Sequence, residues 1–202
     1  GCGNRTLLML LSGKEQPDAG EIAIPEGWHS AMLSPDPYVI TWTNVQRNVS
    51  MACGVGKTPE DRYAHARDFV RLVGLEDYAD LTPMELSTGM KQRLGLARVL
   101  AGQAELLLMD EPFASLDFLT REELQAQLLA VPRAMPRTIV LVTHQLDEAL
   151  LRGQKILVMH PDSTLREFDL TSYDYPRDLS APPMQALKRE ITDQCRRSSA
   201  NA

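Results

Sequence analysis

The feature that most constrains this chain is a run of four apolar residues at 106–109 that ends directly in two acids, Asp110 and Glu111. A short, wholly apolar run of this kind is typical of a strand buried on both faces of a parallel sheet. In open α/β sheets, ligands bind at the carboxyl ends of such strands. We therefore expect Asp110 to hold Mg²⁺, directly or through water, and Glu111 to orient or deprotonate a water molecule. Taken alone, the pair fits a solvated strand end equally well.

Other apolar strands alternate with helical patterns along the chain. The patterns predict strands at 21–24, 30–33, 138–142 and 155–159, and helices at 6–11, 59–73, 89–101, 120–131 and 145–151. Thr120 is the expected N-cap of the helix at 120–131, with Glu123 completing a capping box. This alternation favours an α/β fold with a parallel sheet covered by helices on both faces. We expect one domain over 1–202, with a helical lobe at about 43–102 and a C-terminal tail at about 160–202.

Three further motifs are candidates for phosphate contacts. Ser87 and Gly89 lie where a helix opens, and free N–H groups at a helix N-terminus bind anions, although a plain N-cap is the simpler interpretation. His144 directly follows the strand at 138–142 and is placed to contact a phosphate, whereas a lone histidine is more often a structural polar residue. Asp117 ends the turn at 114–117, which alone reads as an ordinary loop.

The order of these motifs is more specific than any one of them. LSTGMKQR at 86–93, LLLMDEP at 106–112, ASLD at 114–117 and TH at 143–144 follow one another as they do in ABC ATPases. The chain resembles this family. By that resemblance, 86–93 is the signature, 106–110 is Walker B with Glu111 as the catalytic glutamate, 114–117 is the D-loop and His144 is the switch histidine. The segments at 42–49, 109–122, 143–149 and 176–191 are similar to importers of the nitrate, sulfonate and taurine group.

The same resemblance places the end of the phosphate-binding loop at residues 1–6. The pattern of that loop is G-x-x-x-x-G-K-[ST], so the nucleotide positions fall on Gly1, Gly3, Asn4, Arg5 and Thr6. Asn4 stands at the lysine position and is neutral and shorter. Arg5 stands at the Mg²⁺-binding serine position, points about 100° away from the lysine direction and has no acceptor oxygen. Losing one such electrostatic partner costs about 10²–10³ in rate, so this degenerate Walker A predicts little turnover.

Two more positions depart from the family pattern. Alignment on Trp42 puts Pro35 at the Q-loop glutamine, and proline has neither a side-chain amide nor an N–H. Thr88 replaces the first glycine of the signature and adds bulk where the backbone should approach a phosphate. A second G-K-T, at 56–58, has Met51 where the first loop glycine should be and no strand before it. We expect it to be a chance match.

Bulk composition excludes several other classes of protein. The formal net charge of −6 gives no basic footprint for nucleic acid. Three widely separated cysteines give no disulfide framework, which suits a reducing compartment. No apolar run approaches the roughly 20 residues of a membrane helix, and the N-terminus lacks a secretory pattern.

The resemblance implies a RecA-like P-loop NTPase core with a helical lobe, and an N-terminal antiparallel subdomain that is largely missing. It implies ATP and Mg²⁺ bound between two ATPase subunits, identical or different. The loop, Asp110, Glu111 and His144 of one subunit would face Ser87 and Gly89 of the other, with Asp117 near the nucleotide. The expected partners are a second ATPase subunit, membrane permease subunits and, through the permease, a solute-binding protein. The expected place is the cytoplasmic face of the inner membrane.

Three versions of this function stay open. The first is an active importer ATPase for nitrate-, sulfonate- or taurine-type solutes. The second is a non-hydrolysing structural or regulatory subunit whose signature completes the site of a competent partner. The third is a truncated, inactive fragment. The altered loop favours the second and third over the first. A soluble ABC protein of DNA repair or translation would need long insertions in the helical lobe, which this sequence lacks.

Overall fold

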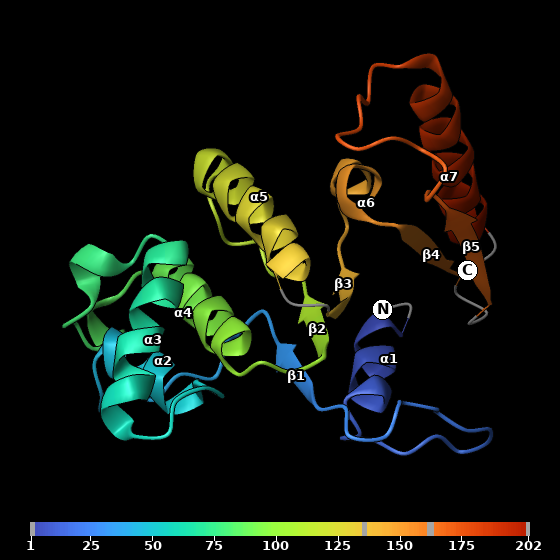
Figure 1. Ribbon diagram of the computed structural model, residues 1–202. Coiled ribbons are helices and arrows are strands. Elements are labelled where there is room, and N and C mark those ends of the chain that lie inside the picture. Colours follow the sequence, from blue (N-terminus) through green and yellow to red (C-terminus); the bar gives the residue numbers. More distant parts are fainter. Residues whose placement is uncertain (1–2, 135–136, 161–163, 201–202) are drawn as a thin grey trace. The chain divides into compact units, whose positions relative to one another are not determined.

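The computed structural model describes residues 3–134, 137–160 and 164–200 (Figure 1). In chain order the elements are α1 (Asn4–Leu11), β1 (Ser30–Leu33), α2 (Val45–Ala52), α3 (Pro59–Leu72), η1 (Glu76–Tyr78), η2 (Pro83–Glu85), α4 (Thr88–Ala101), β2 (Leu106–Asp110), α5 (Phe118–Ala134), β3 (Thr138–Val142), α6 (Leu146–Arg152), β4 (Lys155–Met159), β5 (Leu165–Asp169) and α7 (Pro182–Ala200). They form two compact units, Leu8–Leu141 and Gly1–Leu7 with Val142–Ala202.

A sheet with the strand order β1-β2-β3 forms the centre of the larger unit. Strands β1 and β2 run parallel, in a register that pairs Ser30 with Leu106 and Leu33 with Met109. All five residues of β2 are buried, as its unbroken apolar run predicts. The predicted strand at 21–24 is wrong. That segment has no regular structure, and Ile22 and Ile24 are each 38% exposed.

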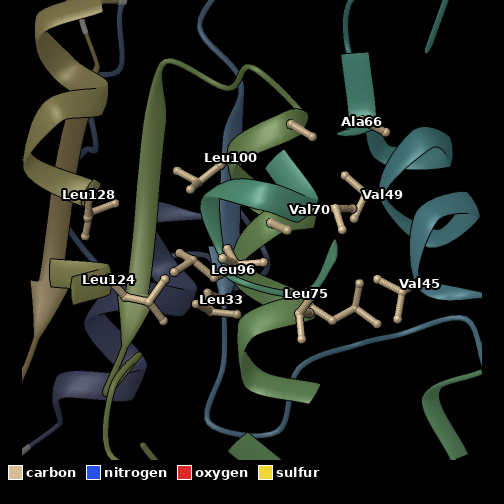
Figure 2. Close-up of a cluster of buried hydrophobic side chains, with 14 of the residues drawn as sticks. Leu33, Val45, Val49, Ala66, Val70, Leu75, Leu96, Leu100, Leu124 and Leu128 are labelled. Atoms are coloured by element: carbon tan, nitrogen blue, oxygen red, sulfur yellow. The ribbon is translucent and has the colours of Figure 1, made fainter. Parts of the chain in front are cut away.

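Helices α2, α3 and α4 pack into one apolar core with the sheet. Figure 2 shows the side chains that meet there, which include Val49 of α2, Val70 of α3, and Leu96 and Leu100 of α4. Leu33 at the end of β1 belongs to the same cluster. The helices predicted at 59–73 and 89–101 are thereby confirmed to within one or two residues.

The second G-K-T, at 56–58, serves to start a helix. Thr58 caps α3 through a capping box in which its hydroxyl accepts from the Asp61 N–H and its own N–H donates to the Asp61 carboxylate, both at 3.1 Å. These bonds hold the pKa of Asp61 below its ordinary value. The residues that suggest a phosphate loop are therefore those of a helix N-terminus.

Helix α5 begins earlier than its sequence pattern predicts. It starts at Phe118, and the Asp117 carboxylate accepts the Thr120 N–H at 3.1 Å. The prediction of Thr120 as N-cap is wrong, because Asp117 is an equally good capping residue three positions earlier.

The smaller unit contains α6, a two-stranded antiparallel sheet of β4 and β5, and α7. The prediction that 155–159 continues the parallel sheet is wrong, since β4 pairs with β5 instead. Leu150, Leu170 and Ile191 form the core of this unit. Arg177 stabilises it by donating to the carbonyl oxygens of Leu150 at 2.9 Å, Gly153 at 2.7 Å and Leu170 at 3.0 Å.

No helix in the described ranges combines the length and the apolar character needed to cross a bilayer.

Candidate nucleotide site

The end of β2 places two carboxylates at the edge of the central sheet. Asp110 closes the strand and is 8% exposed, while Glu111 is half-buried. Glu111 has φ +48°, a left-handed conformation that is uncommon for residues other than glycine. Such backbone costs about 1–3 kcal/mol and persists where the surrounding structure enforces it, often at functional sites. The buried strand therefore fixes both acids where a ligand of an α/β sheet binds.

The turn after Glu111 leads directly into α5. The Ala114 N–H donates to the Glu111 carbonyl and the Leu116 N–H to the Phe113 carbonyl, both at 3.2 Å. Asp117 then caps α5. Bonds from the N–H and hydroxyl of Thr120 hold the pKa of Asp117 below its ordinary value of 3.8, with smaller contributions from the N–H of Asp117 itself and the charge of Arg93. Asp117 is thus ionised at neutral pH, and its carboxylate caps the N-terminus of α5.

The signature segment forms the N-terminus of α4 in the same unit. Ser87 caps the helix, because its hydroxyl accepts the Met90 N–H at 3.3 Å. Gly89 lies against the turn at 114–117: a Cβ there would be 3.4 Å from the Ser115 carbonyl oxygen. The structure therefore brings the predicted signature and D-loop together. Ser87 and Thr88 are exposed, so this helix N-terminus is accessible to an anion.

The predicted end of the phosphate-binding loop lies in the smaller unit, at the start of α1. Gly3 has φ +89°, and its carbonyl accepts the Leu7 N–H at 3.0 Å as the helix begins. Asn4 is half-buried, whereas Arg5 and Thr6 are exposed. Gly1 lies outside the described residues. The backbone at this position forms a helix N-terminus, which favours an anion, but neither Asn4 nor Arg5 supplies the chemistry of the family's lysine and serine.

His144 lies in the loop between β3 and α6 and is exposed. The residues around it hold this loop in shape. The Thr143 hydroxyl donates to the buried carboxylate of Glu148, and the same hydroxyl oxygen accepts the Gln145 N–H at 3.0 Å. His144 is therefore presented on an ordered turn, as a phosphate contact at the end of a strand requires.

The side chains at the predicted ligand positions meet the needs of Mg²⁺ but not those of the nucleotide phosphates. Among the residues that the structure describes, no group of three or more His, Cys, Asp or Glu side chains is placed to hold a metal ion. Magnesium with a nucleotide needs only one or two carboxylates, because phosphates and waters fill its other positions. Asp110 meets that need. At the loop end, Asn4 brings no positive charge and Arg5 no acceptor oxygen, so the phosphate side fits poorly.

Sequence patterns alone did not identify one polar cluster between α2 and α4. Asn48 on α2 and Arg98 on α4 are hydrogen-bonded to each other beneath the segment around Trp42. Two signals could have pointed to Asn48. It lies in the segment at 42–49 that is similar to the importers, and it is a polar residue within an apolar helical stripe. Its partners lie in a loop and on another helix.

Comparison with known proteins agrees with this geometry. The model of the ABC transporter family matches residues 1–114. The taurine import ATP-binding protein TauB of Pseudomonas aeruginosa is 36% identical over 99% of this chain and 71% of its own length. The chain belongs to the ABC transporter family. The nitrate import ATP-binding protein NrtC of Synechococcus elongatus is 38% identical over 88% of this chain and 28% of NrtC.

Solved structures of ABC cassettes share the fold. The dimeric bacterial cassette MJ0796 superposes with a TM-score of 0.75 at 24% identity, over 84% of this chain and 81% of that one. A second structure of MJ0796, bound to ADP and Pi after hydrolysis, gives a TM-score of 0.74. The α/β P-loop NTPase fold expected from the motifs is confirmed. The individual roles of Asp110, Glu111 and His144 stay predictions.

Proposed function

We propose that this chain is the ATP-binding subunit of an ABC importer for small solutes of the taurine, sulfonate and nitrate type. Relatives named for taurine, nitrate and bicarbonate transport support the solute class. In this proposal the chain works at the cytoplasmic face of the inner membrane, beside a second ATPase subunit and a permease that receives solute from a binding protein. ATP binding closes the pair of ATPase subunits, and hydrolysis reopens it.

The chain has two half-sites that depart from the family pattern to different degrees. The signature half-site keeps Ser87 and Gly89 and differs at Thr88, whereas the altered half-site has Asn4 and Arg5 in place of the lysine and serine. Ser87 and Gly89 present the N-terminus of α4, which suits the terminal phosphate of an ATP held by the partner subunit. By the family resemblance, Asp110 would hold Mg²⁺ on the chain's own side, Glu111 would orient water and His144 would contact the terminal phosphate. Asn4 and Arg5 leave that side without its main cation. The observation that carries the proposal is this contrast between a signature turn that keeps Ser87 as helix cap and Gly89 beside Ser115, and a loop end without lysine.

We therefore favour a subunit that completes a competent partner's site and hydrolyses little ATP in its own. The positive charge at the lysine position stabilises the transferring phosphoryl group, and such stabilisation supplies most of the catalysis. Pro35 weakens the same side further, because it replaces the glutamine that senses Mg²⁺ or water.

A surface on the larger unit suits the permease partner. Trp42 is 78% exposed and Met51 is 58% exposed. They line an open hollow of about 550 Å³ together with Thr43, Asn44 and Arg47. Large apolar side chains that gather on a surface mark sites of protein interaction. A tryptophan beside an arginine is also the composition of an interface hot spot.

A complementation experiment tests the proposed division of labour. One chain carries Asn4→Lys and Arg5→Ser, which restores its loop, and Ser87→Arg, which blocks its signature. The second chain is the wild type, with its natural loop and signature. Each alone should hydrolyse little MgATP, whereas the mixture should form one working site from the restored loop and the wild-type signature.

The matched control replaces the wild-type chain with a Ser87→Arg variant, which should leave the mixture inactive. Equal turnover with this control would contradict the role of Ser87. Wild-type turnover that disappears in Glu111→Gln would favour the active ATPase instead.

A further inference from the structure

The segment from Ile40 to Asn44, which we call the Trp42 segment, is hydrogen-bonded to one buried side chain, that of Asn48. Asn48 of α2 is fully buried, and its side-chain nitrogen lies within hydrogen-bond distance of the carbonyl oxygens of Ile40 at 2.8 Å, Thr43 at 3.2 Å and Asn44 at 3.1 Å, which share its two N–H groups. It also lies 2.8 Å from the Thr43 hydroxyl, and its oxygen accepts the Ile40 N–H at 2.8 Å. The backbone on both sides of Trp42 is thus bonded to Asn48.

Arg98 connects this cluster to α4. Its Nη1 donates to the Asn48 carbonyl oxygen at 2.6 Å and to the Asn48 side-chain oxygen at 3.2 Å. The guanidinium is half-buried, and this burial lowers the pKa of Arg98. Burying a cation is costly unless it gains strong hydrogen bonds, so its two bonds to Asn48 fix the relative position of α2 and α4.

Two more residues on α4 contact the segment that precedes Trp42. Gln92 Nε2 donates to the Ser34 carbonyl at 3.4 Å. Gly95 lies so close that a Cβ there would be 2.3 Å from the Pro37 Cβ. Gln92, Gly95 and Arg98 are three residues apart and therefore share one side of the helix. One side of α4 thus contacts the chain from Ser34 to Asn48, while the N-terminus of α4 carries Ser87.

We propose that Asn48 and Arg98 are positioning residues that hold the Trp42 segment in the shape its partner recognises. In this arrangement α4 links the position of the Ser87 turn to the position of Trp42. We call the hydrogen bonds that join Arg98, Asn48 and the Trp42 segment the clamp. The identity of the partner as a permease rests on the proposed function, whereas the clamp does not. A fully bonded buried polar group specifies one loop conformation in a way that an apolar side chain does not.

The test compares buried amides on one helix. Asn48→Ala removes every side-chain bond to the Trp42 segment, and Asn48→Asp keeps the acceptor for the Ile40 N–H but loses the donors. Arg98→Lys keeps the charge with fewer donors. The matched control is Gln46→Ala, because Gln46 is also buried on α2 but donates to the Tyr63 carbonyl of α3 at 2.7 Å.

The readouts are hydrogen exchange of the Ile40 amide and fluorescence anisotropy of Trp42, both in a Trp28→Phe background where Trp42 is the one tryptophan. We expect exchange about tenfold faster in Asn48→Ala, as loss of a buried hydrogen bond gives, together with lower anisotropy. Asn48→Asp and Arg98→Lys should fall between this variant and the wild type. Gln46→Ala should leave both readouts unchanged. Equal effects of Asn48→Ala and Gln46→Ala, or no effect of either, would overturn the clamp.

A second measurement separates the clamp from the proposed partner. The probe is membrane vesicles containing a permease of the taurine or nitrate import class. Binding should weaken about tenfold in Asn48→Ala and should not change in Gln46→Ala. Loss of anisotropy with unchanged binding would overturn the link between clamp and recognition. Absence of binding by the wild-type chain would contradict the proposed function and leave the clamp standing.

Discussion

Two helix N-termini in this chain carry the predicted phosphate contacts, and they differ in the side chains beside them. At α4, Ser87 caps the helix and Gly89 lies close to the Ser115 carbonyl. At α1, Gly3 has the positive φ of a tight loop, but Asn4 and Arg5 follow it. A helix N-terminus supplies N–H groups and a dipole in both cases. Phosphoryl transfer also needs a fixed cation and a Mg²⁺ ligand. If the predicted phosphate positions are correct, the difference between the two termini means that a helix N-terminus is present at both, while the side chains that catalysis needs are changed at α1.

The largest expected effect tests whether the strand end is competent once the loop is restored. In the Asn4→Lys, Arg5→Ser background, Glu111→Gln should lower MgATP turnover by about 10²–10⁴-fold, the range for loss of a general base. In the wild-type loop the same change should have little effect, because little turnover is present to lose. Steady-state phosphate release measures both. A similar proportional loss in the two backgrounds would remove the contrast between the half-sites.

The next effect concerns stability and tests the contact between α4 and the segment after β1. Gly95→Ala should lower the free energy of unfolding by about 1–3 kcal/mol, because the added methyl group overpacks against Pro37. Gly102→Ala is the matched control, since its Cβ would meet nothing closer than 3.5 Å. Urea denaturation followed by circular dichroism gives both values. Equal stability of the two variants would mean that Pro37 moves aside easily.

A smaller effect is expected at the Q-loop position. Pro35→Gln, made in the restored-loop background, should raise turnover up to about tenfold, because one added hydrogen bond is worth about 0.5–1.5 kcal/mol. The control is Asp36→Asn, a change at the neighbouring exposed residue. If both variants give the same rate, the Pro35 substitution contributes nothing to the weakness of the altered half-site.

The smallest effect is a pH dependence at the turn beside the signature. The pKa of Asp117 is lowered from 3.8 by Thr120 and Arg93, so the folded state favours the carboxylate. Its stabilising contribution is present above pH 3.8 and is lost as the pH falls through the lowered value. Asp117→Asn keeps an acceptor oxygen without the charge. The difference in urea midpoint between wild type and variant should shrink below pH 3.8, and a constant difference would argue against this ionised cap.

Local patterns predicted most of the helices and the central strands, because apolar periodicity and capping residues act over short distances. They failed where the answer depended on a distant partner. Strand β4 looks like another parallel strand, but β5 pairs with it through a register that single-sequence patterns do not give. Residues 21–24 have the pattern of a strand and yet are solvent-exposed chain without regular structure.

The candidate site shows the same division. Asp110 and Glu111 could be placed at a strand end from sequence, since a buried apolar run ends there. The close approach of Gly89 to Ser115 could not, because it depends on how α4 packs beside the turn. The bonds of Asn48 to the Trp42 segment could not be predicted either, because they join a loop, α2 and α4.

The most direct test of the account is steady-state MgATP hydrolysis by the purified chain beside its Asn4→Lys, Arg5→Ser variant. We predict little turnover by the wild type and a gain of about 10²–10³-fold in the variant, the size of one electrostatic partner restored to a transferring phosphoryl group. Wild-type turnover that depends on Glu111 and does not rise in the variant would contradict the claim that these two side chains disable the chain's own half-site.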